Sequence, residues 1–217
     1  MDPTTLKNEL SNSKHPLALT GAGISVASGL PTFDISWNDI PVRDILTREF
    51  FLNQPDIFYG LYREILRWND VQPNSAHRAL AKYSVAIITQ NIDGLHQKAG
   101  SKNVLELHGN LRDLICEKCR RIYPSGKALE EKIPHCTCGS MLRPDVVLFG
   151  DQIHDWEQAV EQAQKCDLML VIGTSLQVAP ANLLPGIAQR NGAKVVIINE
   201  DSESLFKKLL DSGTKKQ

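Results

Sequence analysis

Four of the five cysteines fall into two close pairs, Cys116 with Cys119 and Cys136 with Cys138. Thiolates one or two residues apart can reach the same tetrahedral Zn²⁺, and two such pairs joined by a loop form a ribbon with no open ligand position. We therefore expect a structural zinc, with the chemistry elsewhere. Two alternatives stay open: the thiols could be reduced and metal-free, and His135 could be a rival ligand.

Small or polar residues directly follow three apolar runs of the chain. Such turns can present backbone N–H groups, and the positive end of a helix, to the phosphates of a nucleotide. A lone Gly-x-Gly is weak evidence, and a single asparagine could be an ordinary helix cap. Taken together, the three turns favour a dinucleotide site. They are Gly21-Ala22-Gly23, Gly173-Thr174-Ser175 and Asn199.

A fourth apolar run ends in Gln90-Asn91-Ile92-Asp93, and a fifth ends at His108. Two amides and one carboxylate suit recognition of a carboxamide and a ribose. An imidazole at a strand end could serve as a general base, because its pKa lies near neutrality. On its own, however, a histidine in such a place is more often structural than catalytic.

The fold class follows from how apolar runs alternate with helical patterns. The runs at 16–20, 85–89, 104–107, 146–149, 168–172 and 195–198 are expected to be buried strands of a parallel sheet. Helical spacing occupies 24–28, 75–82, 156–165 and 181–190. This alternation predicts an α/β protein with a doubly wound, parallel Rossmann-like sheet.

Two segments interrupt the alternation. Residues 34–70 carry a helical pattern that opens at Pro55, and residues 112–143 contain the cysteines. We expect both to be insertions that form a smaller domain from a helical part and a zinc ribbon. The Rossmann-like domain would then comprise 1–33, 71–111 and 144–217.

Composition excludes several classes of function. The 217-residue chain has 24 basic and 25 acidic residues. It therefore lacks the excess of basic residues that would indicate a nucleic-acid partner. It has neither an apolar stretch of membrane-spanning length nor the apolar core of a signal peptide at its start. Paired thiols in metal-ligand spacing fit a reducing compartment, so we expect a cytoplasmic protein.

The motifs, in their order along the chain, resemble those of the sirtuins, in particular the bacterial ones. The resemblance runs from about Leu17 to Asn199, and six motifs in one order make it highly specific. They are the segment from Gly21 to Phe33, the segment from Thr89 to His96, Leu107-His108-Gly109, the cysteine pairs, Val147-Leu148-Phe149-Gly150 and Gly173-Thr174-Ser175.

This resemblance implies an NAD-dependent protein lysine deacylase that moves the acyl group to ADP-ribose and releases nicotinamide. It implies NAD and Zn²⁺ as cofactors and acyl-lysine proteins or peptides as substrates. The implied catalytic residues are His108, Asn91 and Asp93. The implied NAD contacts are Gly21, Ala22, Gly23, Phe33, Gln90, Asn91, Ile92, Asp93, Gly173, Thr174, Ser175 and Asn199. The implied substrate contacts are Val147, Phe149 and Gly150, with Tyr59 and Tyr62 as candidates for the acyl group.

The chain departs from the family pattern at Asp34, where sirtuins normally carry an arginine after the phenylalanine. A cation near the cofactor is thereby replaced by an acid, so we expect weaker NAD binding, with Arg43 as the nearest basic substitute. In sirtuins that prefer acidic acyl groups, Tyr-x-x-Arg lies on the small-domain helix. Here Arg63 is one step out of register after Tyr59, which favours an uncharged acyl group such as acetyl.

Two other functions remain open from the sequence. One is NAD cleavage without deacylation, by a mono-ADP-ribosyltransferase or an NAD glycohydrolase. The other is a catalytically weak NAD-binding sensor module. Dependence of nicotinamide release on an acyl-lysine peptide separates these possibilities. The number of subunits is not readable from the sequence.

Overall fold

The computed structural model describes residues 2–32, 35–199 and 202–211. Within them, the main sheet has five parallel strands in the order β10-β9-β1-β4-β5. Because β4 and β9 flank β1 on opposite sides, the winding direction reverses at β1, and ligands of such sheets bind at this switch point. The strands are β1 (Pro16–Thr20), β4 (Ala86–Thr89), β5 (Val104–Glu106), β9 (Leu168–Ile172) and β10 (Lys194–Ile198).

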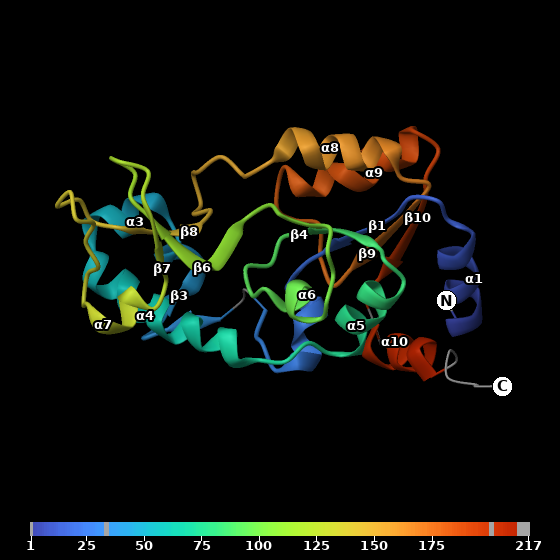
Figure 1. Cartoon of the computed structure of the whole chain (residues 1–217), viewed down its shortest axis with the longest axis horizontal. Helices are drawn as coiled ribbons and strands as arrows, with labels where there is room; N and C mark the ends of the chain where they lie inside the picture. Colours follow the sequence, from blue (N-terminus) through green and yellow to red (C-terminus); the bar gives the residue numbers. More distant parts are fainter. Residues whose placement is uncertain (1, 33–34, 200–201, 212–217) are drawn as a thin grey trace.

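Helices cover both faces of this sheet (Figure 1). Alternate residues of β1 show how: Ala18 packs into one core with Leu6 and Phe206, whereas Leu17 and Leu19 face the other core. The first face carries α1 (Pro3–Asn12), α5 (Ser75–Lys82) and α10 (Ser202–Asp211), and the second carries α8 (Trp156–Lys165) and α9 (Leu184–Arg190). The short elements η1 (Ala22–Ser28), α6 (Leu95–Lys98) and η3 (Ala181–Leu183) follow strands or precede helices.

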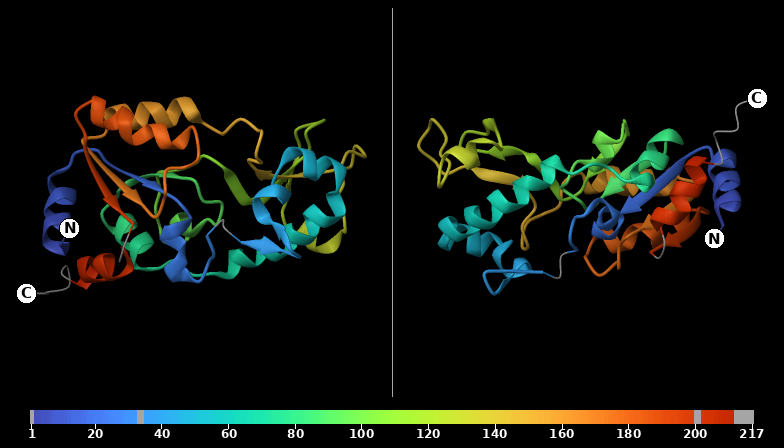
Figure 2. Two further views of the ribbon diagram at one scale, coloured as in Figure 1. Left: turned by 180° about the vertical axis from the view of Figure 1, so that it is seen from behind. Right: turned by 90° about the horizontal axis from the view of Figure 1, so that it is seen from below.

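A second unit lies at the end of the molecule opposite the two termini (Figure 2). Its antiparallel sheet has the order β7-β6-β8, and a separate hairpin pairs β2 with β3. Phe58, Leu114 and Leu142 belong to a core of its own. The strands are β2 (Ser36–Trp37), β3 (Ile40–Pro41), β6 (Gly109–Ile115), β7 (Ile122–Pro124) and β8 (Arg143–Val146). The helices are α2 (Val42–Ile45), α3 (Arg48–Asn53), α4 (Pro55–Leu66), η2 (Arg67–Asp70) and α7 (Lys127–Glu130).

The predicted fold class is confirmed, and one strand assignment is wrong. Residues 146–149 do not enter the parallel sheet, because β8 ends at Val146 and pairs with β6 of the small sheet instead. An apolar run predicts burial but does not say which sheet buries it. Helices α1 and α10 lie outside the helical ranges predicted from the sequence.

Candidate active site and metal centre

Two glycine turns meet at the switch point of the parallel sheet. The Gly23 N–H donates to the carbonyl of Gly173 at 2.8 Å, and the Gly21 N–H donates to that of Ile172 at 3.1 Å. A Cβ atom on Gly23 would lie 2.7 Å from the Gly173 Cα, so a side chain there would separate the turns. Gly173 itself has φ 62°, a conformation that favours glycine. These glycines hold two distant segments in backbone contact.

The polar residues after β4 are joined to those turns. Gln90 Nε2 donates to Thr174 Oγ1 at 2.9 Å, and Asn199 Nδ2 donates to the Thr174 carbonyl at 3.1 Å. Asn91 Nδ2 donates to the Gly21 carbonyl at 3.2 Å. The strand ends that the sequence singled out separately therefore form one connected surface.

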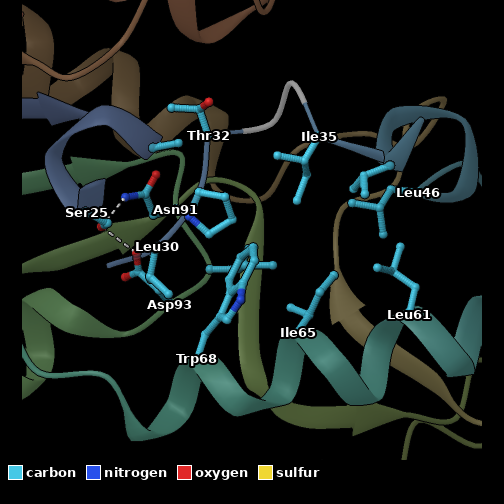
Figure 3. Close-up of a pocket in the computed structure, with 14 residues that line it drawn as sticks. Ser25, Leu30, Thr32, Ile35, Leu46, Leu61, Ile65, Trp68, Asn91 and Asp93 are labelled. Carbon is cyan, nitrogen blue, oxygen red and sulfur yellow. Dashed lines mark hydrogen bonds between the residues drawn. The ribbon is translucent and has the colours of Figure 1, made fainter. Parts of the chain in front are cut away.

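Ser25, Asn91 and Asp93 form a buried polar cluster beneath this surface (Figure 3). Ser25 Oγ donates to Asp93 Oδ2 at 2.7 Å and accepts from Asn91 Nδ2 at 3.2 Å. The other Asp93 oxygen, Oδ1, accepts from the Leu95 N–H at 3.0 Å. Burial raises the pKa of Asp93, while these hydrogen bonds oppose the rise. Ser25 therefore connects the Asn91 amide to the Asp93 carboxylate. It was not among the site residues predicted from the sequence.

One buried atom of this cluster is free for a ligand. Within the described part of the chain, Asn91 Oδ1 is buried and has no hydrogen-bond partner. Such an oxygen needs a donor, because an unpaired buried polar atom is costly. Asn91 borders a pocket whose other walls are largely apolar, including Leu30, Ile65 and Trp68 (Figure 3). A flat carboxamide with its N–H donors, such as the nicotinamide of NAD, fits this chemistry.

His108 lies where the two sheets meet, between β5 and β6. Its Nδ1 atom is 2.8 Å from the backbone carbonyl oxygen of Gln90. Burial lowers the pKa of His108, the Gln90 carbonyl opposes this, and the nearby His154 adds to the lowering. The imidazole lines the same cavity as the glycine turns, together with Gln90 and Ile92.

The segment after β8 forms another wall of that cavity, with Val147, Phe149 and Gly150. The Val147 N–H donates to the His108 carbonyl at 2.9 Å, and the Phe149 N–H donates to the Leu46 carbonyl at 2.9 Å. The Phe149 side chain remains half exposed. After the Gly173-Thr174-Ser175 turn, Gln177 and Val178 also line the cavity. The sequence did not single them out, because nothing in their type marks them as functional.

The predicted acyl contacts Tyr59 and Tyr62 lie elsewhere. Both are buried in the core of the small unit, and neither borders the two cavities described above. Tyr59 Oη donates to the Leu142 carbonyl at 2.5 Å. Helical spacing correctly predicts that the two tyrosines share a buried face. That face packs in the core of the small unit, so the structure does not bring either tyrosine to these cavities.

The chain departs from the family pattern at Asp34, directly after Phe33. Both residues lie outside the described residues. Arg43 lines the cavity of His108 and the glycine turns, and so does Thr32. A cation is therefore present at the edge of the cavity. Its suggested substitution for the missing arginine stays a prediction.

The four paired cysteines converge on one point. Their Sγ atoms all lie within 4.8 Å of one another, with 3.5 Å between Cys116 and Cys138 and 3.4 Å between Cys119 and Cys136. Tetrahedral Zn–S bonds of about 2.3 Å require sulfur atoms roughly 3.8 Å apart, so this donor set fits one Zn²⁺. His135 is not part of the cluster, and its Nδ1 lies 2.7 Å from the Ile133 carbonyl.

A Rossmann-like sheet with a polar pocket at its switch point, joined to a four-cysteine ribbon, defines the class of a nucleotide-dependent enzyme with a structural metal. Comparison with known proteins gives the family. The model of the Sir2 family matches residues 21–180. The chain therefore belongs to the Sir2 family.

Relatives and solved structures agree with this assignment. A protein from Sulfolobus acidocaldarius named NAD-dependent protein deacetylase is 44% identical, with 87% of this chain and 80% of the relative covered. NAD-dependent protein deacetylase 1 from Geobacillus kaustophilus is 42% identical, with 93% and 88% covered. A structure described as Sir2-p53 peptide-NAD+ matches with a TM-score of 0.90 at 34% identity, with both chains fully covered. Another, described as Sir2 bound to acetylated peptide, gives 0.89 at 34% identity, also over both whole chains.

Proposed function

We propose that this protein is an NAD-dependent protein lysine deacetylase in which His108 is the general base. The observation that carries the proposal is the position of the His108 imidazole in one cavity, between the glycine turns and the segment with Val147 and Phe149. A nucleotide on the first wall and an acyl-lysine against the second would meet at this ring. The relatives named as deacetylases support the same activity.

The chain's own groups have distinct parts in this reaction. When bound, NAD supplies a ribose carbon that becomes electrophilic as nicotinamide leaves. Asn91 presents its free Oδ1 to the carboxamide, and Asp93 holds Ser25 and the Asn91 amide in place. His108 takes a proton from a ribose hydroxyl at Nε2, because its Nδ1 is engaged by the Gln90 carbonyl.

The glycine turns and the polar strand ends account for the remaining cofactor contacts. The turns after β1 and β9 suit a pyrophosphate, since they lie at strand ends and one of them opens a helical turn. The full set of proposed NAD contacts is Gly21, Ala22, Gly23, Phe33, Gln90, Asn91, Ile92, Asp93, Gly173, Thr174, Ser175 and Asn199. Proposed peptide contacts are Val147, Phe149 and Gly150, which suit pairing with an extended substrate.

The acyl group is proposed to be acetyl or another uncharged group. Arg63 supports this, because its guanidinium donates to the carbonyls of Ala128 and Lys132 at 3.3 and 3.0 Å. An acidic acyl group would need that cation in the cavity.

The division into a Rossmann-like domain (1–33, 71–111 and 144–217) and a small domain (34–70 and 112–143) is proposed in the same way. The separate core around Phe58 and Leu114 supports it. Among the described residues, no helix has the length and apolarity to cross a membrane. A cytoplasmic location, supported by the clustered thiols, and the absence of a nucleic-acid partner, supported by the balanced charge, complete the proposal.

Nicotinamide release tests the function. Purified protein is incubated with NAD in the presence and absence of an acetyl-lysine peptide, and nicotinamide is quantified by chromatography. The deacetylase reaction predicts release only with the acetylated peptide. Equal release without peptide would instead indicate an NAD glycohydrolase or ADP-ribosyltransferase, and no release in either case would indicate a binding module.

A further inference from the structure

Four charged side chains form a closed ring at the junction between the small unit and the cavity wall. Glu117 accepts from Arg48 through both carboxylate oxygens, at 3.0 and 3.1 Å, and from Arg143 at 3.1 Å. Asp151 closes the ring, since it pairs with Arg143 and lies 3.4 Å from Arg48. Positive and negative groups alternate around the ring, so every neighbour is an opposite charge.

The members of the ring come from three separate parts of the chain. Glu117 lies between the cysteines of the first pair, and Arg48 begins α3. Arg143 begins β8, and Asp151 follows the cavity wall directly. The ring therefore ties the cysteine turn and a helix start to the two ends of the segment that faces His108.

The ring also holds the backbone of that segment. Arg143 Nη2 donates to the Val146 carbonyl at 2.8 Å, and Asp151 Oδ2 accepts from the Leu148 N–H at 3.0 Å. At the start of α3, the Arg48 N–H donates to the Phe149 carbonyl at 3.4 Å. Residues of the ring thus hold the backbone of the segment at Val146, Leu148 and Phe149.

Solvent exposure decides which pair of the ring matters most. The side chains of Arg143 and Asp151 are 17% and 11% exposed, whereas those of Arg48 and Glu117 are 44% and 43% exposed. An exposed pair contributes little, but loss of one partner of a shielded pair leaves a charge without compensation. Asp151 has the added effect that its carboxylate accepts a backbone N–H of the segment.

We propose that the ring of Arg48, Glu117, Arg143 and Asp151 positions the segment 146–150 for binding of the acyl-lysine peptide. This inference rests on the proposed function, because it assumes that the segment receives the substrate. Its members act through the backbone they hold and are positioning residues. The chemistry at His108 and the NAD contacts on the other wall should be unaffected by changes in the ring.

The test compares Asp151→Asn with Asp151→Glu, which keeps the negative charge. Lys132→Met is the matched control, because it removes an ion pair with Asp56 that also joins distant parts of the chain but lies away from the cavity. Binding of a fluorescent acetyl-lysine peptide is measured by anisotropy without NAD. Steady-state kinetics then give kcat and the KM values for peptide and NAD, and thermal unfolding reports stability.

For Asp151→Asn, the peptide Kd and KM should rise about tenfold, equivalent to about 1.4 kcal/mol of binding, while kcat and the NAD KM stay near wild type. Asp151→Glu should recover most of the peptide affinity, and Lys132→Met should match wild type. Wild-type peptide affinity in Asp151→Asn would overturn the proposal. Equal decreases in kcat in both Asp151 variants would also overturn the proposal.

A second variant covers the case in which Asp151→Asn fails to fold. Glu117→Gln, at an exposed position, should raise the peptide Kd by about threefold, and an unchanged Kd would overturn the proposal. Failure of the proposed function is distinguishable, because wild-type protein would then bind no acetylated peptide or leave it acetylated in the kinetic assay. The comparison of peptide affinities among the variants tests the role of the ring, whereas product formation by the wild-type protein tests the proposed function.

Discussion

The Nδ1 atom of His108 lies 2.8 Å from the backbone carbonyl oxygen of Gln90. A carbonyl oxygen can only accept, so Nδ1 carries the proton of the neutral ring and Nε2 keeps a lone pair. Gln90 also contacts Thr174 through its side-chain amide. One residue therefore sets the tautomer of the proposed base and joins two strand ends of the cofactor site.

The pH dependence of activity follows from this arrangement. Burial lowers the pKa of His108 below its ordinary value, with His154 acting in the same direction against the Gln90 carbonyl. Because only the neutral ring can accept a proton, kcat/KM should rise with pH through a midpoint below about 6.5 and then level off. His108→Ala should lower the rate by about 10²-fold or more. A midpoint above neutrality that survives in His108→Ala would assign the base to another group.

Removal of the metal should unfold the ribbon. Metal analysis of freshly purified protein should give about one zinc per chain, and Cys119→Ser should lose it together with the structure of residues 112–143. Cys166→Ser is the control, because that thiol is buried in the core of the parallel sheet and is not part of the cluster. Zinc-free wild-type protein with an intact fold would refute a structural metal site.

A packing prediction concerns Gly60 on α4. A Cβ atom at this position would lie 2.7 Å from the Trp37 ring of the β2–β3 hairpin. Gly60→Ala should therefore lower the free energy of unfolding by about 1–3 kcal/mol in urea titrations, because the ring has to move. Gly126→Ala, where a Cβ meets nothing within 4 Å, should leave stability unchanged or slightly higher. Equal stabilities of the two variants would show that Trp37 moves without cost.

Acid sensitivity should arise from two buried histidines, His77 and His96. Their rings lie 4.8 Å apart, with Asn74 beside the first and Thr20 beside the second. Burial lowers the pKa of His77 to about 4, and it lowers that of His96 well below its ordinary value, with His77 adding to the effect. Both are neutral in the folded protein at pH values where the unfolded chain begins to bind protons.

The sign of the effect follows from these lowered pKa values. The stabilisation is complete above about pH 6.5 and is lost as pH falls towards 4, by roughly 3 kcal/mol for His77. Urea unfolding at several pH values should show a shallower acid loss for His77→Gln than for wild type. His15→Gln, at an exposed position, should keep the wild-type slope. Parallel curves for wild type and His77→Gln would contradict the account.

Local patterns predicted much of the parallel domain, because each strand there is a short apolar run followed by a polar turn. Strands β1 and β9 and helices α5 and α8 have the predicted bounds. Contacts between distant turns, such as Gly23 with Gly173, could not be predicted from the sequence. Each position needs a glycine because the backbone of the other turn leaves no room for a Cβ atom. The cysteine spacing predicted the cluster because ligand geometry restricts it tightly.

The small unit was harder to predict for a physical reason. Tyr59 and Tyr62 have the spacing of a buried helical face, and that face is buried, but the sequence does not say what covers it. The same holds for residues 146–149, which leave the small sheet and run on as a cavity wall. The ring of ion pairs around Asp151 depends on three segments that only the folded chain brings together.

The central claim is transfer of the acetyl group to ADP-ribose at the His108 cavity, and mass spectrometry of the products tests it most directly. Wild-type protein with NAD and an acetyl-lysine peptide should yield deacetylated peptide, nicotinamide and O-acetyl-ADP-ribose in equal amounts, and His108→Ala should lower the yield of deacetylated peptide and O-acetyl-ADP-ribose by about 10²-fold or more. Deacetylated peptide with free acetate and intact NAD, or ADP-ribose formed without any change in the peptide, would contradict the account.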